Sequence, residues 1–217
     1  MTNNNQTLLD MEGMEQTLHP GQSFYAGFWP RLGSLLLDAV ISMPVVLAIL
    51  YLNSMSINMA YYTFVPNILF SLWYQIYLPK RYGGTPGKLL VGIRIIKLDG
   101  SPIGWRESIL RHLITFVMTI VSCLLMFYSL SLADEATFQG LSWLQQTVYL
   151  VSLSPMLFKV SSWVNNIWLY GELIVLLTNK RRRAIHDFIA GTVIVKSSYV
   201  AQIEAAIKSD NNTTVQN

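Results

Sequence analysis

The chain has 217 residues, of which 52% are hydrophobic and only 12% are charged, with a formal net charge of +3. About a quarter of the residues of a soluble protein are charged, so this composition excludes an ordinary soluble domain and indicates a membrane protein in contact with the lipid bilayer. The small positive charge is not accompanied by an aromatic-rich soluble domain, so no nucleic-acid partner is expected.

The first 23 residues are polar and are expected to form a disordered tail. They lack the basic and apolar regions of a secretory signal, so the first apolar segment after them is expected to target the chain and to stay in the protein. Residues 199–217 are expected to form a second polar tail. A transmembrane domain is therefore expected over residues 24–198.

Four apolar segments predict four transmembrane helices, because a bilayer core requires about 20 mainly apolar residues per helix. They cover residues 28–52, 61–78, 109–133 and 162–178. The third contains the one cysteine, Cys123, which excludes a disulfide framework and is expected to be a buried apolar side chain. The uncharged stretch 141–158 resembles a fifth span but is interpreted as interfacial or re-entrant.

The basic residues favour four spans over five. With four, Lys159 alone among the 15 Lys and Arg residues falls on the side opposite the others. The positive-inside rule then places both termini in the cytoplasm and the chain in the cell (inner) membrane. A fifth span would place the basic run 180–183 outside.

The cytoplasmic segments have structural signals of their own. Thr85 and Pro86 suit the start of a short helix. The β-branched segments VGIRIIKL and TVIVK predict strands, and two lone strands would expose their edges, so they are expected to pair as a ribbon. The predicted fold is an all-α membrane protein with four transmembrane helices, interfacial helices and a short cytoplasmic two-stranded ribbon.

An acid, Asp38, interrupts the first apolar segment seven residues after Arg31. At 1.5 Å per residue the two lie about 10 Å apart along a helix, and seven residues make nearly two turns, so both lie on one face. That separation is too large to count on a direct bond. An ionised acid at this depth is costly and is expected to face protein or water, so Asp38 is either a proton carrier or half of a buried pair.

Glu172 is a second acid in an apolar segment, about two turns before the basic run. Further polar residues lie in or beside the predicted spans: Gln75, Arg111, His112, Asn165, Asn166, Tyr170 and His186. They are expected either to line a polar path or to join helices, at about 1 kcal/mol each. Joining helices is favoured for Glu172. The basic side chains of Arg181, Arg182 and Arg183 are expected to contact anionic lipid headgroups.

Motifs for enzymatic activity are not found. GGTPGK, residues 83–88, lacks the spacing and the following Ser or Thr of a phosphate-binding loop. His186 and Asp187 lack the further ligands of a metal site. No catalytic residue, cofactor or metal ion is expected.

Three segments carry a resemblance to a known family: AGFWPRLGSLLLD near the start, GGTPGKLLVGIRIIKLDG in the central loop and RRAIHDFIAGTVIV near the end. In this order, with the predicted spans between them, the chain resembles the RDD family of integral membrane proteins over residues 24–196. The family is named for one arginine and two aspartates. On its pattern the arginine matches Arg31, the first aspartate Asp38 and the second Asp187.

The resemblance implies a membrane location more than an activity. Transport has been suggested for the family, some members look like monovalent cation/proton antiporters, and others look like partners in membrane-protein quality control. Our leading hypothesis is transport of a small ion or solute by a homo-oligomer, with monovalent cation/proton antiport as one form of it, in which Asp38 is the protonatable group and Arg31 modulates it electrostatically. Glu172 would be a secondary contact, and Asp187 and His186 would lie at the cytoplasmic mouth. The alternative is a non-transporting interaction or assembly protein whose buried charges are structural.

Overall fold

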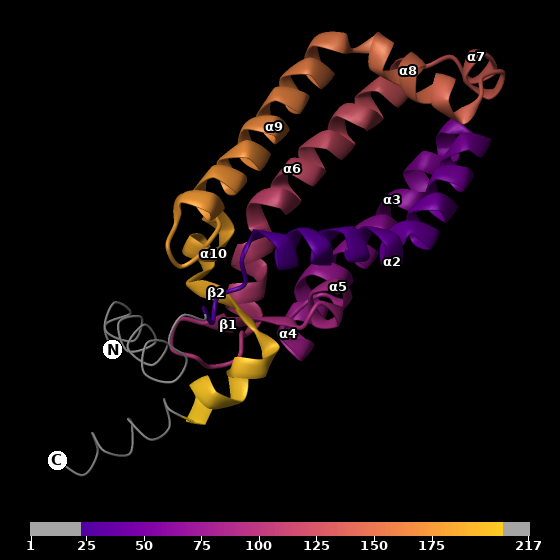
Figure 1. Cartoon of the computed structure of the whole chain (residues 1–217). Helices are drawn as coiled ribbons and strands as arrows, with labels where there is room; N and C mark the ends of the chain where they lie inside the picture. Colours follow the sequence, from indigo (N-terminus) through magenta and orange to yellow (C-terminus); the bar gives the residue numbers. More distant parts are fainter. Residues whose placement is uncertain (1–22, 206–217) are drawn as a thin grey trace.

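The computed structural model describes residues 23–205 (Figure 1). Residues 1–22 of the first expected tail and residues 206–217 of the second lie outside the described part. Two long helices, α2 (Phe28–Met55) and α6 (Trp105–Leu132), are the described helices that are both long and apolar enough to cross a membrane. Their apolar side chains are mostly exposed, as expected for helices that face lipid.

A second helical run follows α2 and has no break. It consists of α3 (Ile57–Leu72), the π-helical turn η1 (Trp73–Tyr77) and α4 (Leu78–Tyr82). Gly83 ends the run with a φ of +78°, the left-handed conformation that favours glycine. The run is longer than the expected span 61–78.

The segment between α6 and the last long helix differs from expectation. It contains α7 (Glu135–Gln139) and α8 (Trp143–Leu153), and then α9 (Pro155–Thr178) begins seven residues before the expected span. The physical reason is local, because a proline suits the first turn of a helix and Pro155 directly follows the irregular Ser154.

The expected ribbon is present: β1 (Ile93–Lys97) and β2 (Thr192–Lys196) pair antiparallel, with Ile95 opposite Ile194. Both outer edges are covered. Ala26 N–H donates to the Ile194 carbonyl at 2.9 Å on one edge, and Lys97 N–H donates to the Ser101 carbonyl at 2.9 Å on the other. Covered edges protect the ribbon from pairing with another chain.

Short helices surround the ribbon: α5 (Pro86–Leu90) and α10 (Ile185–Ala190). Figure 1 shows α2, α4, α5, α6 and α10 meeting around β1 and β2, and we call this region, residues 78–97 and 185–196, the ribbon end. At the opposite end of the long helices, α7 and α8 cover the tips of α3 and α6. A small apolar core of Ile57, Leu130, Phe138 and Leu150 joins them there.

The second polar tail is predicted to begin at residue 199, but in the structure residues 197–205 continue from β2 as a helix. Ile203 is 1% exposed and Tyr199 lies 4.9 Å from the ring of Phe24. The apolar side chains of this polar-looking segment are spaced four residues apart, so they cover one face of the ribbon.

Candidate functional site

Asp187 is the centre of the main polar cluster and lies in the first turn of α10. Its side chain is fully buried. One carboxylate oxygen accepts a hydrogen bond at 3.0 Å from the Ala184 backbone N–H, the nitrogen at the start of the helix. An acid at this position satisfies an unpaired N–H and interacts well with the helix dipole, which explains the local choice of residue.

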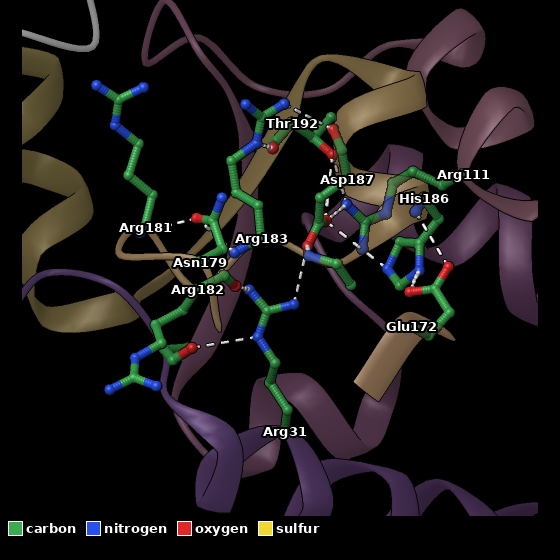
Figure 2. Close-up of polar contacts among 12 residues, drawn as sticks. Arg31, Arg111, Glu172, Asn179, Arg181, Arg182, Arg183, His186, Asp187 and Thr192 are labelled. Carbon is green, nitrogen blue, oxygen red and sulfur yellow. Dashed lines mark hydrogen bonds and ion pairs between the residues drawn. The ribbon is translucent and has the colours of Figure 1, made fainter. Parts of the chain in front are cut away.

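Two arginines from long helices bind this carboxylate (Figure 2). Arg31 of α2 donates to one oxygen at 2.9 Å, and Arg111 of α6 donates to the other and to the Thr192 hydroxyl. Arg31 also donates through Nε to the Ala26 carbonyl at 3.1 Å. The guanidinium groups are nearly as buried as the acid, with side-chain exposures of 10% and 9%.

A third arginine, Arg183, completes the cluster from the segment before α10. It is 6% exposed and donates at 3.0 Å to the backbone carbonyls of Thr192 and Asp187. The expectation that Arg183 contacts lipid headgroups is therefore wrong. Figure 2 shows Arg183 turned toward Thr192, whereas the side chains of Arg181 and Arg182 extend away from Asp187.

Burial alone would raise the pKa of Asp187. The positive charges of Arg111, His186 and Arg31 outweigh it and hold this pKa far below the ordinary carboxyl value. Asp187 therefore stays ionised at every physiological pH. It is a counter-ion that joins α2, α6 and α10.

Glu172 extends the cluster from α9. One oxygen accepts a hydrogen bond at 3.1 Å from the His186 backbone N–H, and the other lies 2.9 Å from His186 Nδ1. His186 Nε2 in turn lies 3.7 Å from Asp187. Through these contacts three long helices, α2, α6 and α9, reach the same cluster, whereas α3 does not.

Asp38 does not belong to this cluster, although it shares a helix with Arg31. One oxygen accepts hydrogen bonds from the Tyr74 hydroxyl at 2.6 Å and from the Gly87 backbone N–H at 2.7 Å. The other accepts one from the Thr85 hydroxyl, and Lys88 Nζ lies 3.9 Å from it. We call Asp38 with these four partners the acid pocket.

The acid pocket depends on a close backbone approach. A Cβ atom added to Gly87 would lie 2.3 Å from the Ser34 carbonyl oxygen and 2.7 Å from Asp38 Cγ. Only glycine therefore allows α5 to lie directly on α2, which brings its N–H within reach of Asp38.

The remaining residues singled out from the sequence lie apart. Gln75 is exposed in η1. His112 is buried in α6, and its Nε2 has no hydrogen-bond partner among residues 23–205. Asn165 lines an apolar groove between α6 and α9 and donates to the Ser161 carbonyl of its own helix. The structure thus joins Arg31, Arg111, Glu172, His186 and Asp187 and separates them from the others.

Sequence reasoning missed five partners: Tyr74, Thr85, Lys88, Arg183 and Thr192. The signal for Thr85 and Lys88 was available, since they flank Gly87 in a polar motif that ends next to an apolar segment. Tyr74 carries no comparable signal, because it is one of many aromatic residues in its run.

Comparison with known proteins identifies the family of the chain. The model of the RDD family matches residues 25–191, a range that contains Arg31, Asp38 and Asp187. The Uncharacterized protein YckC of Bacillus subtilis (strain 168) is 29% identical over 187 residues, which cover 85% of this chain and 91% of YckC. No solved structure matches the chain. The family match covers well over half of the sequence, and the chain therefore belongs to the RDD family.

Proposed function

We propose that this RDD protein is a non-transporting membrane interaction or assembly protein, in which the motif charges hold the ribbon end onto the long helices. The observation that carries the proposal is that both motif aspartates are used for internal contacts. Asp187 is held by Arg31 and Arg111, and Asp38 accepts hydrogen bonds from three donors. A carrier group needs a free site for a proton or an ion, and neither carboxylate has one among its described neighbours.

One groove among the described residues favours the same interpretation. The groove between α6 and α9 has a volume of about 640 Å³ and is lined almost wholly by apolar side chains. Neither Asp38 nor Asp187 lines it. An ion path would require polar groups along its walls, and this groove supplies almost none.

We further propose four spans: α2, the run from α3 to α4, α6 and α9. The 24 residues of α9 make a helix about 36 Å long, enough to cross the bilayer core. The basic residues Lys80, Arg94 and Lys97 lie at the ribbon end, which supports a cytoplasmic location for that end in the inner membrane.

The substitution Asp38→Asn tests the role of the acid pocket. We expect it to lower the free energy of unfolding by about 2 kcal/mol, because an amide oxygen replaces a carboxylate that accepts three hydrogen bonds. Thermal unfolding in detergent and protein abundance in membranes measure the loss. Asp99→Asn is the matched control, since Asp99 is exposed and binds only Ser101 in its own turn.

Ion flux into proteoliposomes is the decisive measurement for the proposal. We expect no cation or proton flux above that of protein-free vesicles, for wild type and for Asp38→Asn alike. A wild-type flux that Asp38→Asn abolishes without loss of stability would contradict the proposal.

Proton-coupled cation transport is the second candidate, and one observation favours it. Burial, and then the charge of Arg111, lower the pKa of Lys88 to about 8, although Asp38 opposes the shift. Lys88 Nζ lies 3.9 Å from Asp38 and donates to the Thr85 hydroxyl at 3.2 Å. A lysine that releases its proton near physiological pH would leave the carboxylate free to take a cation instead.

In this second candidate Lys88 is the group that titrates. Transport would then rise as pH increases through about 8, the pH at which Lys88 loses its proton. Lys88→Arg keeps a positive charge at every pH used and is expected to abolish flux, while Arg81→Lys, at an exposed position of α4, leaves it unchanged. Cation flux into proteoliposomes from pH 6.5 to 9 measures this, and an unaltered profile in Lys88→Arg would exclude it.

A further inference from the structure

The last long helix, α9, has two unlike faces. Successive residues of an α-helix are rotated by about 100°, so Leu157, Val160 and Val164 share one face. These residues line the apolar groove against α6. Ser162, Asn166 and Tyr170 recur every four residues on the opposite face, and we call them the α9 polar stripe.

The α9 polar stripe has no partner within the described chain. All three residues are exposed, and their side chains make no hydrogen bond with any other residue of 23–205. Figure 1 shows α9 at the outer edge of the molecule, next to α6 on one side only. The stripe therefore faces away from the protein.

Asn166 lies near the middle of α9, eleven residues after Pro155 and twelve before Thr178. In the four-span arrangement proposed above, α9 crosses the membrane beside α6, with which it shares the groove, and its middle then lies at the depth of the bilayer core. An amide without hydrogen bonds in hydrocarbon is strongly unfavourable. Polar side chains on membrane helices accordingly face other helices, where they form hydrogen bonds.

The geometry points to a second copy of this chain as the partner of the α9 polar stripe, in a homodimer with α9 packed against α9. An amide both donates and accepts, and so do the hydroxyls of Ser162 and Tyr170, so the stripe is complementary to itself. A two-fold axis beside Asn166 would bring the two amides together, as in an isologous interface. Lys159, on the same face, lies seven residues nearer the helix start, about 10 Å away along the axis, and its long side chain reaches toward water.

This inference rests on the proposed span of α9, but it does not depend on whether the protein transports an ion, because it concerns the outer face of α9 and neither motif aspartate. An assembly protein and a transporter can both be dimers. Neither outcome of the flux measurements therefore argues for or against the α9 homodimer.

Cysteine cross-linking of the full chain in liposomes tests the interface while Asn166 is retained. In a Cys123→Ser background, Ser162→Cys and Tyr170→Cys are expected to form disulfide-linked dimers under mild oxidation. Val164→Cys is the matched control, because it lies in the same turns but lines the groove. Equal cross-linking at all three positions, or none at Ser162→Cys and Tyr170→Cys, would overturn the inference.

Asn166→Leu tests the energetic role of the amide. We expect the dimer association constant, measured by energy transfer between labelled copies as lipid dilutes them, to fall about tenfold. Asn166→Gln keeps the amide and is expected to retain most of the association. A constant unchanged in Asn166→Leu would overturn the inference, as would cross-links only to a different protein in native membranes.

Discussion

Asp187→Ala is expected to lower the free energy of unfolding by about 3–5 kcal/mol, more than the other single substitutions proposed for this chain. The loss arises because Arg31 and Arg111 stay buried without the carboxylate that compensates their charge. Asp187 also accepts from the N–H that starts α10, so that helix loses a cap in the same step. Reversible unfolding of the purified protein, in detergent or in bicelles, measures the loss.

The matched control is Asp99→Ala, which removes an exposed acid in the turn that follows β1. We expect a change within about 0.5 kcal/mol for it. Arg31→Met combined with Asp187→Ala is expected to cost less than the sum of the two single substitutions, because the double variant no longer buries Arg31 without its partner. Strict additivity, or a small effect of Asp187→Ala alone, would contradict the assignment of Asp187 as the shared counter-ion.

The same substitution has a defined pH dependence. The pKa of Asp187 is lowered in the folded state, so its contribution to stability is complete above the unfolded-state pKa of about 4 and is lost only as pH falls further toward the folded value. Wild type and Asp187→Ala are therefore expected to differ by a constant amount between pH 6 and 8. Convergence of the two within that range would mean that the acid is not held by the arginines.

Gly87→Ala is expected to cost about 3 kcal/mol, the second-largest effect. Its new methyl group would lie 2.3 Å from the Ser34 carbonyl oxygen, backbone that cannot give way. The helix α5 must then move off α2, which breaks the Gly87 hydrogen bond to Asp38. The loss is measured as a lower Tm and as faster proteolysis of the loop that contains α5.

Gly33→Ala is the matched control for this close approach. It lies on the same helix as Ser34, and its added Cβ would meet only a Val91 methyl group at 3.9 Å. Alanine in a helix interior is expected to be neutral or to stabilise by up to about 1 kcal/mol. Equal effects of Gly33→Ala and Gly87→Ala would contradict the claim that Gly87 is required for the tight packing of α5 on α2.

Local signals in the sequence were enough to predict the small elements of the ribbon end. Thr85 and Pro86 start a helix because of their own backbone preferences, and the two β-branched segments form strands that pair to cover their edges. The RDD family was also recognisable, because its motifs are short and ordered along the chain. These features depend on residues that are close in the sequence.

The partners of the charged residues could not be predicted in the same way. Helical periodicity puts Arg31 and Asp38 on one face of their helix, but it does not say which neighbour reaches each of them. Arg31 binds an acid 156 residues away, and Asp38 accepts hydrogen bonds from donors that reach it because Gly87 has no side chain. Such choices follow from how the helices pack, which no pattern within one helix contains.

The separation of 156 residues between Arg31 and Asp187 also determines when the cluster can close. Arg31 leaves the ribosome early, and Arg111 follows, but their counter-ion is made only after the last long helix. A product truncated before α10 would carry both guanidinium groups with no carboxylate to hold them. Closure of the cluster therefore marks a chain that has been synthesised at least as far as α10.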